Sequence, residues 1–127
     1  MFKLIMLTTK EKSYKLKSFV AIQHSFDGKK ENSHVHTVEI NCTIKTMEDI
    51  IDYKMAEGLI ESCIHKYENK YLNDFGDFRE DATIEHFGEV LCGEIDDELS
   101  QNGYSMNRFE IGETPLRIYV ITDELRD

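Results

Sequence analysis

Leu16 to Ile44 reads LKSFVAIQHSFDGKKENSHVHTVEINCTI, and this segment determines the expected fold more than any other part of the chain. Apolar residues recur at every second position on both sides of a polar stretch, Asp27 to Ser33. Such alternation is typical of strands that turn one face to a core. The segment therefore predicts an antiparallel hairpin with a long loop, with strands over about Tyr14 to Phe26 and His34 to Lys45. The apolar positions are Leu16, Val20, Ile22 and Phe26 in the first strand, and Val38, Ile40, Cys42 and Ile44 in the second.

After this hairpin the apolar residues recur at three- and four-residue steps. The spacing predicts an amphipathic helix over about Asp52 to Tyr67, with Asp52 or Asp49 as its N-cap. A second helix is expected to begin after Thr83, which has the side chain of an N-cap, and to end near Asn102 and Gly103.

Two closing runs, about Ser105 to Gly112 and Leu116 to Thr122, predict a final hairpin. Tyr71 to Asp81 is expected to form a loop. The opening residues, Phe2 to Leu7, are apolar enough for an extra edge strand or an extension of the first strand. The expected order is ββααββ, an α+β fold with a four-stranded antiparallel sheet, in one domain over residues 1–127.

Composition excludes several classes of function. A formal net charge of -10 argues against nucleic-acid partners, because binding to phosphates needs a basic surface. Cys42, Cys63 and Cys92 are far apart and lack CxxC spacing, which argues against a disulfide framework or a thiolate zinc site. The chain has no run of about eighteen apolar residues and no signal-like cleavage site after its opening, so we expect a cytoplasmic protein without a membrane span.

Three histidines, His24, His34 and His36, fall where the predicted hairpin can bring them together. His34 and His36 are two residues apart, so their side chains point to the same face of a strand. His24 has the parity of the apolar positions and lies near the end of the preceding strand. Three imidazoles can hold Zn²⁺ and leave a fourth position for water or substrate. Surface histidines without a metal are the alternative interpretation.

The same residues resemble motifs of a known family. Phe19 to His24 resembles the F-x-A-x-H opening of the 6-pyruvoyl-tetrahydropterin and 6-carboxy-tetrahydropterin synthases, and Ser33 to Val38 resembles their HGHNY segment. Further motifs match in the same order, and the chain is identified as a divergent member over about Leu16 to Tyr119. The further matches are Ile51-Asp52-Tyr53, Tyr71-Leu72-Asn73-Asp74, Ala82-Thr83-Ile84-Glu85 and Gly112-Glu113-Thr114.

The resemblance implies the tunnelling fold, in which two helices cover one face of an antiparallel sheet. It also implies a homohexamer made of two stacked trimers, with active sites formed between subunits. The implied partner is a small pterin substrate, and the implied cofactor is Zn²⁺ on the three histidines. Zinc would polarise the side-chain oxygens of a dihydroneopterin-type substrate.

The resemblance also assigns substrate-binding residues. A glutamate in the position of Glu113 grips the guanidine-like edge of the pterin ring, because a carboxylate can accept parallel hydrogen bonds from neighbouring N–H donors. Phe109 and Ile111 share the parity of Glu113, which puts the carboxylate at the end of an apolar stripe. Thr83, in the motif that opens the second helix, is carried over as a second substrate-binding residue.

The usual proton-transfer residues of the family are replaced in this chain. No cysteine lies just before His34, and Glu68 and Asn69 stand where the family has an Asp-His pair from a neighbouring subunit. Glu31 resembles a variant class in which glutamate replaces the cysteine and dihydroneopterin triphosphate is cut to 6-hydroxymethyl-dihydropterin. A carboxylate beside zinc can serve as general acid and base, and Glu68 is a second candidate base.

These features support two functions. The first is a zinc-dependent pterin lyase that acts on 7,8-dihydroneopterin triphosphate or a related pterin through Glu31. The second is a family paralogue that binds a pterin-like ligand through Glu113 with altered or lost catalysis. The carboxy-tetrahydropterin synthase activity of the queuosine pathway is a third interpretation, disfavoured by the missing cysteine. Candidate basic residues for a triphosphate are Lys30, Lys66, Lys70, Arg108 and Arg117.

Overall fold

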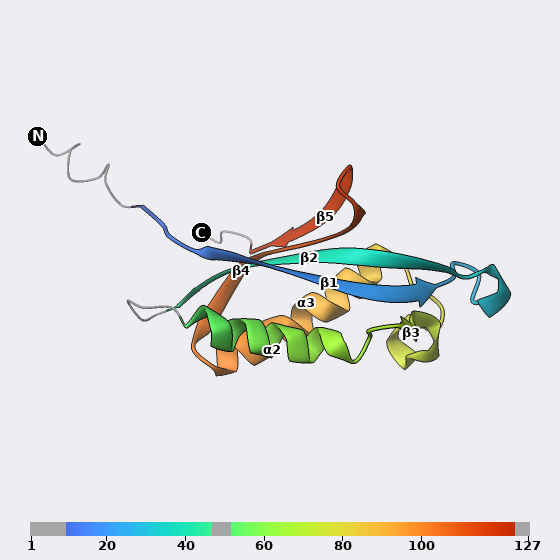
Figure 1. The fold of residues 1–127 in the computed structure, drawn as a ribbon, viewed down its shortest axis with the longest axis horizontal. Helices are drawn as coiled ribbons and strands as arrows, with labels where there is room; N and C mark the ends of the chain where they lie inside the picture. The colour runs from blue at the N-terminus through green and yellow to red at the C-terminus, as the bar shows by residue number, and fades with distance from the viewer. Residues whose placement is uncertain (1–9, 47–51, 124–127) are drawn as a thin grey trace, which may run out of the picture.

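The computed structural model describes residues 10–46 and 52–123, which form a five-stranded sheet with two α-helices on one face (Figure 1). The strand order across the sheet is β3-β1-β2-β4-β5. The predicted α+β class and the placement of both helices on one face are confirmed. The elements are β1 Tyr14–His24, β2 His34–Thr46, α2 Tyr53–His65, β3 Lys70–Tyr71, α3 Ile84–Gln101, β4 Tyr104–Thr114 and β5 Arg117–Thr122.

The sheet has one strand more than the four predicted. The short β3 pairs in parallel with Ile22 and Gln23 of β1, where the sequence predicts only the start of a loop. Asn69 turns the chain onto this sheet edge with a φ of 60°, and its backbone N–H donates to the Ala21 carbonyl at 2.7 Å. A strand of two residues leaves no alternation in the sequence. The predicted order ββααββ is therefore corrected by this one element.

The predicted helix caps are confirmed. The Asp52 side chain accepts the backbone N–H of Met55 at 3.1 Å, and the Thr83 hydroxyl accepts that of His86 at 3.2 Å. The first helix ends at His65, two residues earlier than predicted. The strand or extension expected over residues 2–7, the alternative cap at residue 49 and the motif residue at 51 lie outside the described residues. No helix in the described ranges is long and apolar enough to span a membrane.

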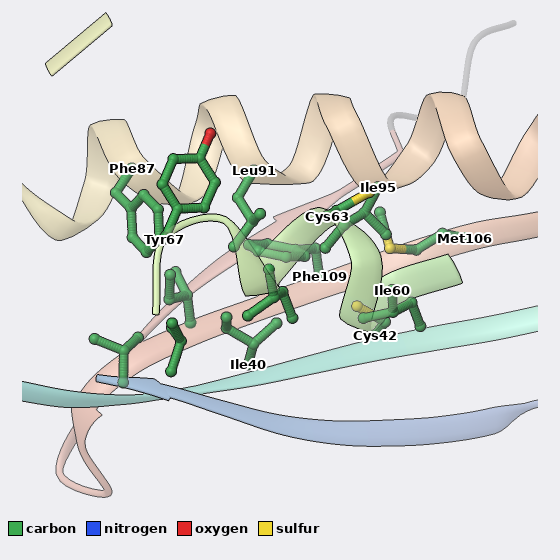
Figure 2. Close-up of a cluster of buried hydrophobic side chains, with 14 of the residues drawn as sticks. Ile40, Cys42, Ile60, Cys63, Tyr67, Phe87, Leu91, Ile95, Met106 and Phe109 are labelled. Atoms are coloured by element: carbon green, nitrogen blue, oxygen red, sulfur yellow. The ribbon is translucent and has the colours of Figure 1, made fainter. Parts of the chain in front are cut away.

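The hydrophobic core lies between the sheet and the two helices. Alternate side chains of each strand face the helices, because strand side chains alternate between the two faces. Figure 2 shows side chains of the sheet meeting those of α2 and α3. The labelled side chains are Ile40, Cys42, Met106 and Phe109 from the sheet, Ile60 and Cys63 from α2, Tyr67 just after α2, and Phe87, Leu91 and Ile95 from α3.

A β-bulge in β4 determines which side chains at the end of that strand point to the core face of the sheet. The register between β2 and β4 shifts between Thr43 and Ile44, which leaves Asn107 as an extra residue. An extra residue inverts the alternation, so even-numbered Met106 and odd-numbered Phe109 are both buried in the core. The end of β4 therefore turns its odd-numbered side chains to the face that carries the histidines.

Gly88 allows α3 to lie close to β4, and replacing it tests this packing. A Cβ at Gly88 would lie 2.8 Å from Cγ2 of Ile111, whereas a Cβ at Gly93 of the same helix meets nothing within 4 Å. We expect Gly88→Ala to lower the free energy of unfolding by about 1–3 kcal/mol through overpacking. Gly93→Ala should raise it by up to about 1 kcal/mol, because alanine favours the helix. Urea unfolding compares the two variants, and equal midpoints would contradict the close approach.

Candidate metal centre and adjoining hollow

Three histidines lie together at one end of the β1–β2 hairpin. His24 pairs directly with His34 across the two strands, and His36 lies diagonally opposite on the same face. The ring centroids are 4.6 Å apart for His24 and His34, 4.6 Å for His34 and His36, and 5.3 Å for His24 and His36. One nitrogen from each of the three rings lies within 4.8 Å of the other two, so the group could hold a metal ion.

A backbone carbonyl fixes the orientation of His24. The His24 side chain is fully buried, and its Nδ1 lies 2.7 Å from the carbonyl oxygen of Ala82. Because a carbonyl only accepts hydrogen bonds, Nδ1 carries the proton and Nε2 keeps a free lone pair. Burial lowers the pKa of His24, although the Ala82 hydrogen bond and the Glu113 charge act in the opposite direction. With Nδ1 held by Ala82, Nε2 is the nitrogen of His24 that is available to a metal.

The donor set fits a transition-metal ion such as zinc. Three neutral imidazoles are a usual ligand set of catalytic zinc sites and leave a further position open. The Nε2 atom of His24 is buried and has no hydrogen-bond partner. An unsatisfied buried polar atom costs about 1–3 kcal/mol, and a bound cation would remove this cost. The residues predicted from parity as metal ligands are thus brought together by the fold.

Glu113 connects the histidines to a neighbouring hollow. Its carboxylate oxygens lie 3.5 Å from Nε2 of His24 and 3.3 Å from Nε2 of His36. The hollow has a volume of about 310 Å³, which suits a small organic ligand. Phe26 also lies between the histidines and the hollow, because its ring lines the hollow and packs 5.2 Å from the His24 ring. The lining residues are Phe26, Ile84, Glu85, Ile111, Gly112, Glu113, Thr114, Arg117, Ile118 and Tyr119.

The buried amide of Asn73 holds the chain immediately after His24, a role that no sequence pattern predicted. The Asn73 side chain accepts the backbone N–H of Ser25 at 3.1 Å and donates to the Ser25 carbonyl at 3.2 Å. The Ser25 hydroxyl lies 2.8 Å from that of Tyr71. These contacts fix the end of β1 where the first histidine is placed. The match of residues 71–74 to a family motif could have indicated that Asn73 has a role, but the motif does not show that its partner is the Ser25 backbone.

Thr83, predicted to bind substrate, acts as a helix cap. Besides accepting the His86 N–H, its hydroxyl donates to the Asp81 carboxylate at 2.8 Å. Glu85, two residues further on, lines the hollow, whereas Thr83 does not. The hydrogen bonds of the Thr83 hydroxyl are therefore made within its own loop and helix.

Glu31 and Glu68, predicted as catalytic residues, lie apart from the histidine group within one subunit. Glu31 is exposed in a short 3₁₀ turn, Lys30–Asn32, between β1 and β2. The Glu68 carboxylate accepts the backbone N–H of Ala21 at 3.0 Å, at the outer edge of β1. Neither glutamate belongs to the histidine group or to the lining of the hollow.

One predicted basic residue reaches the hollow, and it is Arg117. Lys66 and Arg108 form ion pairs with carboxylates of the same subunit. Lys30 lies over a tyrosine ring, and Lys70 belongs to the short edge strand β3. Arg117 is thus the candidate best placed to meet an anionic group of a ligand in the hollow.

The fold and the site define a class, namely a protein with three histidines that could hold a metal ion, next to a hollow of small-molecule size at the end of an antiparallel hairpin. A family model described as 6-pyruvoyl tetrahydropterin synthase matches residues 8–124. The chain therefore belongs to the 6-pyruvoyl tetrahydropterin synthase family, a family of metal-dependent, lyase-type enzymes of pterin metabolism. The resemblance predicted from the sequence is confirmed.

Several solved structures have the same fold. A Caenorhabditis elegans 6-pyruvoyl tetrahydropterin synthase superimposes with a TM-score of 0.72 at 13% identity, covering 88% of this chain and 95% of the other. The Plasmodium falciparum synthase gives 0.60 at 11% identity, and a Plasmodium vivax synthase gives 0.61 at 10%; each comparison covers 91% of this chain and 100% of the other. No curated protein matches the chain in sequence.

Removing the Asn73 amide tests the support of the site. We expect Asn73→Ala to destabilise the protein by about 1–3 kcal/mol, because the buried N–H and carbonyl of Ser25 lose their partners. Asn102→Ala is the matched control, since Asn102 is exposed and donates to the Glu98 carbonyl at 2.8 Å. Its effect should stay within about 0.5 kcal/mol. Thermal unfolding measures both variants, and an Asn73→Ala effect no larger than the control would refute this role.

Proposed function

We propose that the chain is a zinc-dependent pterin lyase that converts 7,8-dihydroneopterin triphosphate, or a closely related pterin, to 6-hydroxymethyl-dihydropterin. The observation that carries this proposal is the group of three imidazoles, with one buried free nitrogen, beside a hollow of small-molecule size. His24, His34 and His36 would hold the zinc ion. When bound, zinc would supply Lewis-acid polarisation of the oxygens on the pterin side chain.

Glu113 and the apolar lining would hold the pterin ring. The Glu113 carboxylate can accept two parallel hydrogen bonds from the guanidine-like ring edge, which gives orientation as well as affinity. Phe26 and Tyr119 also line the hollow, and their rings offer faces on which a flat heterocycle can pack. These contacts would set the side chain of the pterin toward the histidines.

Glu31 is proposed as the general acid and base. It would take a proton from a side-chain hydroxyl, so that the adjacent carbon–carbon bond breaks and leaves an aldehyde on the phosphorylated fragment. The electron pair stays with the ring fragment, which takes a proton to give the 6-hydroxymethyl product. A glutamate of the Plasmodium vivax synthase is described as a catalytic residue in structures where it is replaced by alanine or cysteine. This supports a glutamate in the same role here.

The proposed active form is a homo-oligomer, with a hexamer of two stacked trimers as the expected assembly. The outer strand β5 and the turn before it expose apolar side chains, with exposed fractions of 94% for Leu116 in the turn, and 45% for Ile118 and 39% for Val120 in the strand. Exposed strand edges with apolar side chains favour pairing with another chain. Glu68 lies at the opposite edge of the sheet, so assembly would bring it toward the site of a neighbouring subunit.

Metal content tests the metal centre directly. We expect about one zinc ion per subunit in the purified protein, as four-coordinate sites with three protein ligands typically bind one ion. His34→Ala should lose the metal, whereas His65→Ala, in the exposed last turn of α2, should retain it. Elemental analysis of the three proteins decides the matter, and a His34→Ala variant with full zinc content would exclude the proposed ligand set.

Turnover tests the role of Glu31. With 7,8-dihydroneopterin triphosphate as substrate, Glu31→Gln should lower kcat by about 100-fold or more, as expected for loss of a general acid and base. Glu57→Gln, on the exposed surface of α2, is the control and should leave the rate unchanged. A zinc-loaded wild type that binds the pterin without converting it would favour the second function, a pterin-binding paralogue. Two observations favour this alternative. Glu31 and Glu68 lie apart from the histidine group within one subunit, and the aligned pair of Glu68 and Asn69 lacks the usual histidine.

A further inference from the structure

Glu113, the proposed pterin anchor, contacts two of the three histidines. Its two carboxylate oxygens lie 3.5 Å from Nε2 of His24 and 3.3 Å from Nε2 of His36. His24 Nε2 nevertheless has no hydrogen-bond partner. Since Nδ1 of this ring donates to Ala82, Nε2 is the nitrogen that is available to a metal, and it faces a carboxylate oxygen. A metal cation bound here could contact both atoms.

The separations match those between neighbouring ligands of a four-coordinate metal. Two donor atoms that each lie about 2.0–2.1 Å from a tetrahedral ion are about 3.3–3.4 Å apart. The distances from Glu113 to the two imidazole nitrogens fall next to this value. His34 completes the histidine group, because its ring packs 4.6 Å from each of the other two. Glu113 contacts His24 and His36, and its carboxylate would shift toward His34 to bind the same ion.

We propose that Glu113 is the fourth ligand of the metal in the protein without substrate, and that substrate must displace this carboxylate to reach the metal. The inference rests on the proposed three-histidine metal site. In the resting protein, His24, His34, His36 and Glu113 close the coordination sphere and exclude water from it. The single negative charge of the carboxylate also reduces the net charge of the centre and hence its Lewis acidity.

The surroundings of Glu113 allow its side chain a second position, directed into the hollow. It follows Ile111 where the register between β4 and β5 shifts, so the strand end does not hold it in a regular ladder. A quarter of the side chain is exposed, and it lines the hollow together with Arg117, the one basic residue of the lining. Rotation toward the hollow would place the carboxylate where a ring edge binds.

Displacement would couple ring recognition to metal access. A carboxylate that contacts His24 and His36 cannot at the same time hold the far edge of a pterin whose side chain occupies the metal. The two roles of Glu113 therefore exclude each other and follow in sequence. Only a ligand that offers paired N–H donors would draw Glu113 off the metal, so ring chemistry and side-chain chemistry are selected together.

Cobalt substitution tests the proposal without an activity assay. Co²⁺ is added to the metal-free full-length protein, its visible spectrum is recorded, and a chromophoric chelator gives the dissociation constant. We expect Glu113→Gln to weaken Co²⁺ binding by at least about 10- to 100-fold, the effect of losing an outer-shell partner of a metal ligand, since a ligand contributes no less. Azide should alter the spectrum of Glu113→Gln at concentrations that leave the wild type unchanged. Glu85→Gln, which lines the same hollow but does not belong to the histidine group, is the control and should bind Co²⁺ and respond to azide as the wild type does.

The outcomes separate this proposal from the proposed function. If wild type and Glu113→Gln bind Co²⁺ equally and respond equally to azide, Glu113 is not a ligand, while the three-histidine site stands. If the wild type binds no Co²⁺, or His34→Ala binds it as tightly, the metal site itself is refuted together with this proposal. Melting temperatures of the metal-free proteins identify a folding defect. Should Glu113→Gln not fold, Glu113→Asp, which keeps the charge but shortens the reach, must show the same weakened binding.

Discussion

The register of the β1–β2 hairpin is the constraint on which the rest of the site depends. His24 lies opposite His34, and His36 follows two residues later on the same face. A slip of one residue would send His34 and His36 to the uncovered face and leave His24 without partners. The register is secured by the apolar positions of both strands, which are buried against the helices only in this alignment. The same strand register is therefore needed both to bury the core residues and to bring the three histidines together.

A second layer of contacts turns this register into a defined site. The Ala82 carbonyl sets the tautomer of His24, and Ala82 belongs to the segment just before α3. Asn73 holds both backbone polar groups of Ser25 from the loop after β3. Two residues distant in sequence thus position His24, Ala82 through its ring and Asn73 through the backbone of the next residue. Because orientation of a metal-ligating imidazole depends on its other nitrogen, the loops on this side of the sheet support the ligand set rather than only connecting helices.

The sequence predicts those parts of the fold that are periodic. The two long hairpins and both helices leave alternation or three- and four-residue spacing over ten or more residues, and Asp52 and Thr83 have the side chains of caps. The strand β3 spans two residues and arises from the left-handed turn at Asn69, which no pattern encodes. The histidine cluster was predictable because parity and pairing decide it.

Other features of the site depend on tertiary placement and were out of reach. The parity of Glu113 was predictable, but its contact with His24 and His36 depends on the bulge at Asn107 and the irregular end of β4. Thr83 and Glu85 are two residues apart in one motif. The Thr83 side chain caps the helix by accepting a backbone N–H, whereas the Glu85 side chain lines the hollow. Sequence motifs therefore located the site region, whereas local backbone geometry decided which side chain faces the ligand.

The charge of the chain bears on how a phosphorylated ligand could enter this site. The protein carries a formal net charge of -10, and the lining of the hollow contains Glu85 and Glu113 against a single basic residue, Arg117. An anion approaching such a hollow meets a repulsive field unless cationic groups lie nearby. A divalent metal on the three histidines is the strongest such charge available, and a carboxylate bound to it would cancel half of that charge. Withdrawal of Glu113 by the ring edge would thus raise the attraction of the centre for the oxygens of the ligand at the step when they must bind.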